Sequence, residues 1–288
     1  MAIILSGSPV AQTILTALRP RVSCLREVGI MPTLAILRVG EKADDLAYER
    51  GLMKRCSAVG IDVKSTFMPQ DCTTDELISE IRRINEDNSV HGCLLLRPLP
   101  KQLDTQSICA ILSPRKDVDG MTPASLGGVF MHSGVGYAPG AAQACMELLD
   151  YYGIDPTGMN AVVIGRSLVL GKPVAMLLQD RSATVTMCHT KTRDLAGICA
   201  KADILVAAAG CADLINKDYV NYSQTVIDAG INTRSDGSLC GDADFAAVEP
   251  LVRAITPVPN GVGAVTTAVL CARVVDAAEK VVDCWPGK

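Results

Sequence analysis

A glycine-containing turn that follows a short apolar run is the segment of the chain best suited to chemistry. Residues 161–164 are Ala-Val-Val-Ile, and they are followed by Gly165, Arg166, Ser167 and then Gly171. Glycine lets a backbone approach a pyrophosphate, and the N–H groups that begin the next helix can receive it. The pattern departs from G-x-G-x-x-G because Ser167 replaces the middle glycine. The turn therefore predicts a dinucleotide site, or else a glycine turn of an α/β protein that binds no dinucleotide.

The end of the next apolar segment bears on which dinucleotide would bind. It reads Cys188-His-Thr-Lys-Thr-Arg193, with no acidic residue before Asp194. NAD sites usually end this strand in Asp or Glu, which binds the ribose 2′-hydroxyl, whereas a 2′-phosphate prefers cations. Together with Arg166, these basic and hydroxyl groups predict NADP rather than NAD. The alternative is a solvated basic loop.

Composition and charge exclude several classes of protein. The 288 residues carry 27 Lys and Arg against 31 Asp and Glu, with no basic run, so no nucleic-acid partner is expected. A hydrophobic fraction of 49% argues against disorder. No long uncharged apolar run is present, so no membrane span is expected. The N-terminus lacks the pattern of a signal peptide, which predicts a cytoplasmic protein.

The chain has 12 cysteines, whose spacing argues against a metal site. No C-x₂₋₄-C occurs, so the usual zinc and iron–sulfur spacings are absent. A chain of this length can bury a core without disulfides. The sequence therefore predicts free thiols that pack as small apolar residues, and no bound metal.

Short apolar runs alternate with amphipathic segments, as in an α/β protein with parallel strands. The strands predicted in the first half are 33–39, 62–67 and 90–96, and in the second half 161–164, 183–188, 203–209, 225–228 and 254–257. The predicted helices include 44–59, 74–88 (with Thr73 or Thr74 as N-cap), 172–179 and 266–282. The Gly-rich stretch 132–142 is the predicted domain junction.

Four segments together resemble the bifunctional methylenetetrahydrofolate dehydrogenase/methenyltetrahydrofolate cyclohydrolase family of bacterial type. They are Lys116-Asp-Val-Asp-Gly120, Val162-Val-Ile-Gly165-Arg-Ser167 with Gly171-Lys-Pro173, Asp228-Ala-Gly-Ile-Asn232, and Ile255-Thr-Pro-Val-Pro-Asn-Gly-Val-Gly263. Their order and spacing match the family over essentially the whole chain. The resemblance implies oxidation of 5,10-methylenetetrahydrofolate with NADP, hydrolysis of the methenyl product to 10-formyltetrahydrofolate, and a homodimer.

The resemblance also implies the domains. An N-terminal α/β folate-site domain would cover 1–141 and be completed by a C-terminal helix, 266–288, that returns to it. A Rossmann-type doubly wound parallel sheet that binds NADP would cover 142–265.

Most site residues follow from the same resemblance, position by position. The predicted catalytic residues are Tyr48 and Asp119, with Lys54 as the candidate to replace the family lysine. The folate cleft falls on Tyr48, Asp119, Pro259 and Gly263, together with Arg97, which departs from the family pattern. The cofactor would contact Gly165, Arg166, Ser167, Gly171, Thr190 and Ile231. A carboxylate accepts two adjacent N–H donors, which suits Asp119 to a pterin ring. The alternative for Asp119 is that it caps the turn at Gly120.

The chain departs from the family pattern around the expected folate cleft. The family's Y-x-x-x-K places a lysine four residues after the tyrosine, where this chain has Leu52, and Leu96 replaces the glutamine of V-Q-L-P-L-P. Lys54 lies about 120° around a helix from Tyr48, so it could replace the family lysine only if the helix were irregular near Gly51. The departures predict a divergent branch in which dehydrogenase activity survives more readily than cyclohydrolase activity, because hydride transfer needs less proton chemistry.

Two other interpretations remain open from the sequence. One is a non-catalytic paralogue of the same fold that binds folate or nucleotide without turnover. The other is a dehydrogenase for a different small substrate, because a fold does not determine a function.

Overall fold

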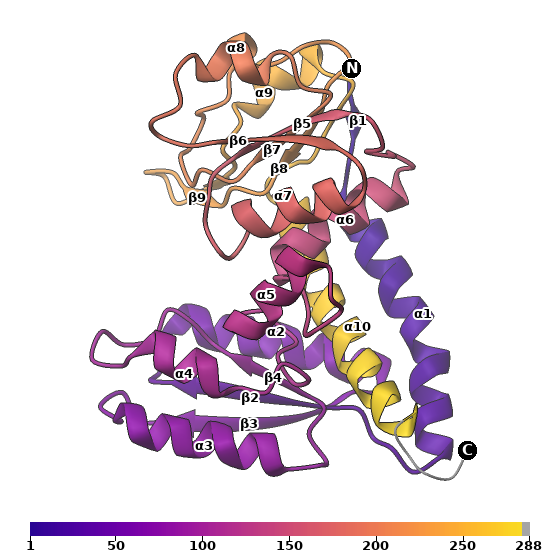
Figure 1. The fold of residues 1–288 in the computed structure, drawn as a ribbon, viewed down its shortest axis with the longest axis vertical. Helices are drawn as coiled ribbons and strands as arrows, with labels where there is room; N and C mark the ends of the chain where they lie inside the picture. The colour runs from indigo at the N-terminus through magenta and orange to yellow at the C-terminus, as the bar shows by residue number, and fades with distance from the viewer. Residues whose placement is uncertain (284–288) are drawn as a thin grey trace. The chain divides into compact units, whose positions relative to one another are not determined.

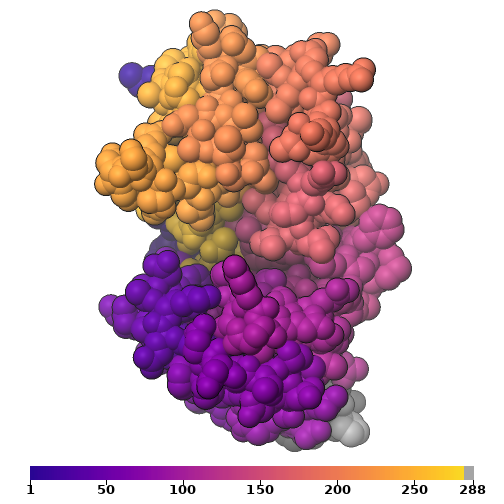
Figure 2. Space-filling view, turned by 90° about the vertical axis from the view of Figure 1, so that its left-hand side faces the viewer, coloured from indigo at the N-terminus to yellow at the C-terminus, as the bar shows by residue number. Residues whose placement is uncertain are grey.

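The computed structural model describes residues 1–283 and contains two compact units. We call residues 13–138 with 267–283 the three-stranded unit, and residues 1–12 with 139–266 the six-stranded unit. The sequence placed residues 1–12 in the first domain, but the structure groups them with the six-stranded unit, because β1 (Ile3–Ile4) pairs in parallel with β11 (Ala254–Ile255). Figure 2 shows the indigo N-terminal residues protruding beside orange and yellow residues of the same unit.

The three-stranded unit contains a parallel sheet with the order β3-β2-β4 (Figure 1). Its strands are β2 (Thr33–Val39), β3 (Asp62–Met68) and β4 (Gly92–Leu95). Its helices are α2 (Ala43–Val59), α3 (Thr74–Glu86), α4 (Thr105–Ile111) and α5 (Pro123–Met131). The central strand β2 is buried along nearly its whole length, as its continuous apolar run predicts for a parallel sheet.

Local signals explain where the elements of this unit begin and end. Helix α3 begins after Thr73, whose hydroxyl accepts the N–H of Glu76 while the Glu76 carboxylate accepts the N–H of Thr73. Helix α2 ends at Gly60, which adopts a left-handed conformation with φ +85°. Both helices therefore have boundaries within two residues of those that the sequence predicts.

The six-stranded unit contains a parallel sheet with the order β1-β11-β8-β7-β5-β6. Its longer strands are β5 (Asn160–Ile164), β6 (Thr184–Cys188), β7 (Ile204–Ala207) and β8 (Thr225–Asp228). Its remaining elements are α6 (Gly140–Tyr151), α7 (Gly171–Asp180), α8 (Leu195–Cys199), α9 (Phe245–Val248), the short helices η1 (Lys217–Tyr219) and η2 (Glu249–Leu251), and the ribbon of β9 (Asn232–Thr233) with β10 (Leu239–Cys240). The predicted doubly wound α/β fold is confirmed.

Two long helices each begin in one unit and end in the other. They are α1 (Gly7–Glu27) and α10 (Val262–Asp283). Helix α10 begins four residues before the predicted start at residue 266, and the predicted residues 284–288 lie outside the described part of the chain. Among residues 1–283, no helix combines the length and the apolar character that a membrane crossing requires.

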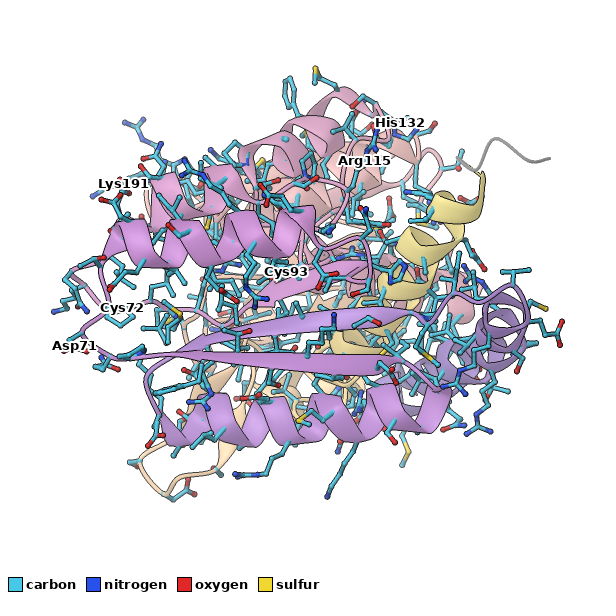
Figure 3. The ribbon with its side chains drawn as sticks, turned by 90° about the horizontal axis from the view of Figure 1, so that it is seen from below. Asp71, Cys72, Cys93, Arg115, His132 and Lys191 are labelled. Atoms are coloured by element: carbon cyan, nitrogen blue, oxygen red, sulfur yellow. The ribbon has the colours of Figure 1, made fainter. Side chains whose placement is uncertain are left out.

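Cysteines mostly pack inside the two units. All 11 cysteines in the described part of the chain are free thiols, and only Cys24 and Cys211 of these are exposed. Figure 3 places Cys93 on the sheet of the three-stranded unit, where it is 1% exposed. Burial raises the pKa of the Cys93 thiol to about 12, so it is protonated at neutral pH. These thiols act as small apolar residues, as the spacing predicts; Cys284 lies outside the described residues.

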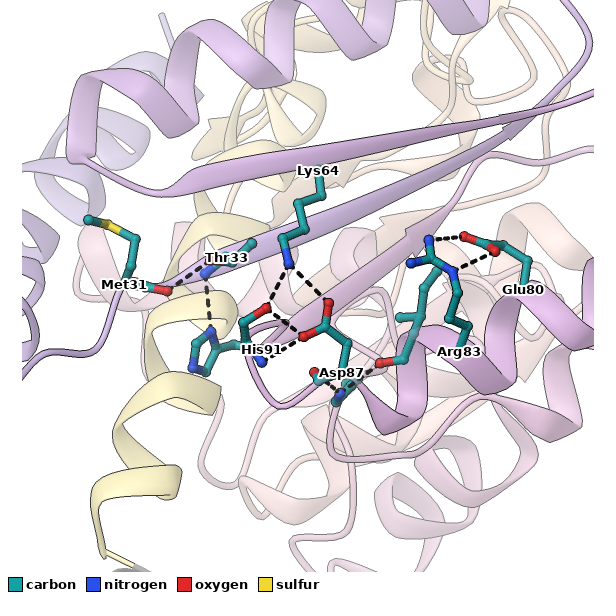
Figure 4. A network of polar contacts seen from close by, with 10 residues as sticks. Met31, Thr33, Lys64, Glu80, Arg83, Asp87 and His91 are labelled. Atoms are coloured by element: carbon teal, nitrogen blue, oxygen red, sulfur yellow. Dashed lines mark hydrogen bonds and ion pairs between the residues drawn. The ribbon is translucent and has the colours of Figure 1, made fainter.

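His91 fixes the amino end of the three-stranded sheet (Figure 4). Its side chain is buried, and its Nδ1 accepts the backbone N–H of Thr33 at 3.2 Å. Burial and the charge of Lys116 lower the pKa of His91 below its ordinary value of 6.5. The folded state therefore favours the neutral imidazole. The neutral His91 stabilises the fold above pH 6.5, and this stabilisation is lost as the pH falls through the lower pKa that His91 has in the folded state.

Replacing His91 with Asn is expected to reduce the loss of thermal stability on acidification below pH 6.5. An asparagine oxygen can still accept from Thr33 but does not titrate in this range. The measurement is Tm against pH for wild type, His91→Asn and the exposed-site control His132→Asn. Parallel curves for all three proteins would contradict the prediction.

Candidate functional site

A cavity of about 370 Å³ opens in the three-stranded unit beside the carboxyl end of β4. Its lining residues come from α2, from β4 with the segment after it, and from the loop before α5: Asp44, Asp45, Tyr48, Leu94, Leu95, Leu96, Arg97 and Asp119. The carboxyl ends of parallel strands are where α/β sheets bind ligands. Three of the residues predicted for the folate cleft, Tyr48, Arg97 and Asp119, therefore meet around one cavity.

Asp119 and Arg97 form an ion pair in this cavity. Arg97 Nη2 donates to Asp119 Oδ2 at 3.0 Å, and each side chain is 27% exposed. Burial raises the pKa of the Asp119 carboxyl, and the charge of Arg97 opposes that shift. Both side chains line the cavity, and a carboxylate there can accept from a ligand with N–H donors.

The loop that carries Asp119 is held by Asp117. The fully buried Asp117 carboxylate accepts from the backbone N–H of Met121 at 3.0 Å, from that of Thr122 at 2.8 Å and from the Ser125 hydroxyl at 2.6 Å. Of the two aspartates in the motif, Asp117 thus has the turn-holding role that the sequence left open for Asp119. Asp117 was not among the predicted site residues, because both aspartates lie in the same short motif and the sequence does not separate their roles.

A buried arginine, Arg273, lies close enough to Asp119 to interact with its charge. Arg273 is 5% exposed, donates from Nη1 to the Val118 carbonyl at 2.9 Å, and lies 5.6 Å from the centre of the Tyr137 ring. Burial lowers its pKa to about 10, against the opposing effect of Asp119, so it stays charged at neutral pH. In the sequence, Arg273 stands out as the one arginine in the Ala/Val run of the C-terminal helix. It was not among the predicted site residues.

Tyr48 lines the cavity as a neutral hydrogen-bonding group. Desolvation, with a smaller contribution from the charge of Asp119, raises its pKa to about 12. The phenol is therefore protonated at neutral pH, and it can donate a hydrogen bond but is a poor base.

Lys54 is not brought to the cavity, which corrects the assignment of a catalytic position to it. Helix α2 runs without interruption through Gly51, so Lys54 keeps the direction about 120° from Tyr48 and is exposed. Leu52, at the position of the family lysine, is 0% exposed in the apolar core. Arg55 turns toward α10, where its Nη1 donates to the Thr267 hydroxyl. No lysine is among the residues that line this cavity.

In the predicted cofactor turn, backbone segments lie too close together to leave room for a side chain. Gly165 has φ +127°, and a Cβ on it would overlap the Ala208 carbonyl oxygen. A Cβ on Gly171 would likewise overlap the Gly165 carbonyl, so α7 begins directly against the turn. The Ser167 hydroxyl accepts the N–H of Leu170 at 3.2 Å and the N–H of Gly171 at 3.4 Å. Neither position admits a side chain, because neighbouring backbone atoms already occupy that space.

The other predicted cofactor residues also lie at the carboxyl ends of strands of the six-stranded sheet. Arg166 and Ser167 are exposed after β5, Thr190 is exposed after β6, and Ile231 is 65% exposed after β8. The strand order reverses between β5 and β7, because β6 lies on one side of β5 and β7 on the other. This switch point is where doubly wound sheets form a ligand crevice.

Pro259 and Gly263, the remaining predicted folate residues, belong to the six-stranded unit. Both are exposed. In the described residues 1–283, no group of three or more His, Cys, Asp or Glu side chains is arranged to hold a metal ion.

Known proteins match the chain over nearly its whole length. Residues 5–119 match the family model described as tetrahydrofolate dehydrogenase/cyclohydrolase, catalytic domain, and residues 139–282 match its NAD(P)-binding domain. A curated relative, the bifunctional protein FolD of Clostridium kluyveri, is 46% identical over 96% of this chain and 98% of its own.

Two solved structures are also similar. The FolD dehydrogenase/cyclohydrolase of Campylobacter jejuni superposes with a TM-score of 0.95 at 35% identity, covering 98% of this chain and 100% of its own. The Trypanosoma brucei enzyme, solved with NADP and an inhibitor, gives a TM-score of 0.91 at 32% identity, covering 98% of each chain. The chain therefore belongs to the tetrahydrofolate dehydrogenase/cyclohydrolase family.

Proposed function

We propose that the protein oxidises 5,10-methylenetetrahydrofolate to 5,10-methenyltetrahydrofolate with NADP⁺, as part of one-carbon metabolism in the cytoplasm. The observation that carries the proposal is the meeting of Tyr48, Arg97 and Asp119 around one cavity of the domain that matches the family's catalytic domain. Membership of the family and the relatives' dehydrogenase activity support the same reaction.

Each cavity residue has a role in positioning the folate. The Asp119 carboxylate accepts adjacent N–H groups of the pterin ring, and the charge of Arg97 favours its ionised form against the burial that raises its pKa. The Tyr48 hydroxyl donates to a ring or bridge heteroatom, and Leu94, Leu95 and Leu96 supply an apolar wall. Positioning of this kind suits hydride transfer, because the chemical step then needs no protein base.

The glycine turn fits NADP. Gly165 and Gly171 keep the turn tight and free of side chains, which lets a pyrophosphate approach its backbone, and Arg166 with Thr190 supplies a cation and a hydroxyl for the 2′-phosphate. When bound, NADP⁺ accepts the hydride that leaves the methylene carbon of the folate.

An absorbance assay for methenyltetrahydrofolate tests the function. Purified protein with methylenetetrahydrofolate and NADP⁺ is expected to form product, and NAD⁺ in parallel is expected to be a poorer substrate. A silent assay, combined with a Tm that NADP⁺ still raises, would favour the non-catalytic paralogue instead. Absence of both responses would contradict the cofactor assignment as well.

The variant Arg166→Ala is expected to raise the KM for NADP⁺ by about 10- to 100-fold and to leave the KM for NAD⁺ nearly unchanged, because a charge-assisted hydrogen bond to the 2′-phosphate is lost. A matched control is Arg181→Ala, since Arg181 is an exposed arginine of the same unit that pairs with Asp150 at 2.7 Å. Equal changes for NADP⁺ and NAD⁺ would contradict a role for Arg166 at the 2′-phosphate.

A homodimer through the six-stranded sheet is part of the proposal. Strand β6 is the edge of that sheet, and its five residues, Thr184–Cys188, include neither a charge nor a proline. Unprotected edge strands of this kind pair readily with another chain. Light scattering is expected to show a dimer for the wild type and a monomer for Thr186→Lys, which puts a charge on the exposed part of the edge. A monomeric wild type would contradict the proposed assembly.

A further inference from the structure

The loop after β7 is attached to a single carboxylate. The N–H groups of Ala209, Gly210 and Cys211 all donate to the side chain of Asp242, at 2.6, 3.1 and 2.9 Å. Asp242 is 0% exposed. Three successive backbone donors are thereby directed inward, toward the body of the unit, and they are not available to a phosphate.

Asp242 is in turn fixed from two sides. Asn232 Nδ2 donates to Asp242 Oδ1 at 2.9 Å, and the backbone N–H of Asp242 donates to Asp228 Oδ1 at 3.0 Å. The Asp228 carboxylate also accepts the N–H groups of Gly230, at 3.0 Å, and of Ala243, at 2.8 Å. The two buried carboxylates therefore connect the loop after β7 to the loop after β8.

Gly230 and Gly241 have no side chains, and the two carboxylates occupy the space that side chains there would take. A Cβ on Gly230 would overlap the Asp242 carboxylate, and a Cβ on Gly241 would overlap the Asp228 carboxylate. The backbone thus packs directly against both side chains, which leaves them little freedom to move.

The connected loops border the predicted cofactor crevice. Ala208 donates its N–H to the Ile164 carbonyl at 2.8 Å, and its own carbonyl lies against Gly165 of the glycine turn. On the other side, Gly230 immediately precedes the exposed Ile231. Asp242 therefore determines the course of the chain on the β7 and β8 sides of the switch point.

We propose that Asp242, held by Asp228 and Asn232, is a positioning residue that shapes the NADP crevice without contacting the cofactor. The inference rests on the proposed NADP site. Because the three N–H groups of the β7 loop are bound to Asp242, the pyrophosphate takes its backbone donors from the glycine turn. The β7 loop contributes a fixed wall to the crevice.

Titration of NADP⁺ by calorimetry, together with KM values, tests the proposal. Asp242→Asn keeps the size of the side chain but removes the carboxylate, and we expect NADP⁺ to bind about 10- to 100-fold more weakly with a parallel rise in its KM. The KM for methylenetetrahydrofolate is expected to change by less than about threefold. All measurements are made well below the Tm of each variant, since lost stability alone lowers the active fraction and leaves KM unchanged.

Asp203→Asn is the matched control. The Asp203 carboxylate also accepts a backbone N–H, from Asn160 at 2.8 Å, but this contact lies at the amino end of β5. We expect it to change Tm without changing NADP⁺ affinity.

The outcomes separate the inference from the proposed function. If the wild type does not bind NADP⁺, the proposed cofactor is wrong. If the wild type binds and Asp242→Asn binds equally well, the positioning role is wrong. Should Asp242→Asn fail to fold, Asn232→Ala decides: it removes one donor to Asp242, and NADP⁺ affinity equal to that of the wild type would overturn the inference.

Discussion

Replacing Asp119 with asparagine is expected to lower kcat/KM for methylenetetrahydrofolate by about 100-fold or more. An amide presents one acceptor oxygen in place of two, and it carries no charge, so one charge-assisted hydrogen bond to the pterin is lost and the other is weakened. Hydrogen bonds to charged groups contribute about 1.5–3 kcal/mol each, which corresponds to this loss. The affinity for NADP⁺ is expected to remain unchanged, because Asp119 belongs to the cavity of the three-stranded unit.

Asp87→Asn provides the control for this change. Asp87 and Lys64 form an ion pair at 3.0 Å, the same distance as Asp119 and Arg97, but at the amino end of the three-stranded sheet (Figure 4). We expect its steady-state kinetics to match those of the wild type. An Asp119→Asn enzyme with unchanged KM and kcat for the folate would show that this carboxylate does not bind substrate.

Hydrolysis of methenyltetrahydrofolate is expected to proceed at close to the spontaneous rate, while the dehydrogenase reaction remains active. Hydrolysis needs a water molecule to be activated, and a placed acid or base usually contributes about 10²- to 10⁴-fold. The cavity offers the carboxylates Asp44, Asp45 and Asp119, a tyrosine that holds its proton, and Arg97, but no amine. The two activities are therefore expected to differ, with hydrolysis slower by about that factor than it would be with a placed acid or base.

Parallel assays of 10-formyltetrahydrofolate formation and of methenyltetrahydrofolate formation measure this difference. Hydrolysis far above the spontaneous rate that disappears in Lys54→Ala would contradict the prediction and would require α2 to rearrange. Leu96→Gln alone is not expected to restore hydrolysis, because the family lysine is still absent. Leu52→Lys is expected to destabilise the fold, since Leu52 is fully buried and an amine there would lose its hydration.

The sequence predicted strands best where an apolar run has clear ends. Strand 33–39 is bounded by Gly40, and strand 225–228 ends in Asp228; the structure has both at the predicted residues. The sequence could not predict β1, because Ile3 and Ile4 are exposed and become a strand only through pairing with β11, far along the chain. The start of α10 was placed too late because glycines at residues 261 and 263 resemble a turn.

The candidate site was predictable to the extent that its residues lie in recognisable motifs. Tyr48 and Asp119 were carried over from the family pattern, and Arg97 was noted as a departure from it. The separate roles of Asp117 and Asp119 depend on which carboxylate points into the core, and that is set by contacts with Met121, Thr122 and Ser125. Asp242 had no local signal, because its three backbone donors in the loop after β7 lie more than 30 residues before it.

Pairing of the first strand with the last has a consequence for protein synthesis. Ile3 pairs opposite Ala254, so β1 leaves the ribosome long before its partner exists. At roughly 5–20 residues per second, the intervening chain takes on the order of 10–50 seconds to make. During that interval the two exposed isoleucines and their unpaired backbone groups have no sheet to join. The N-terminal segment therefore completes its fold only after nearly the whole chain has been translated, and a nascent chain halted before residue 254 would leave that segment open to proteases and chaperones.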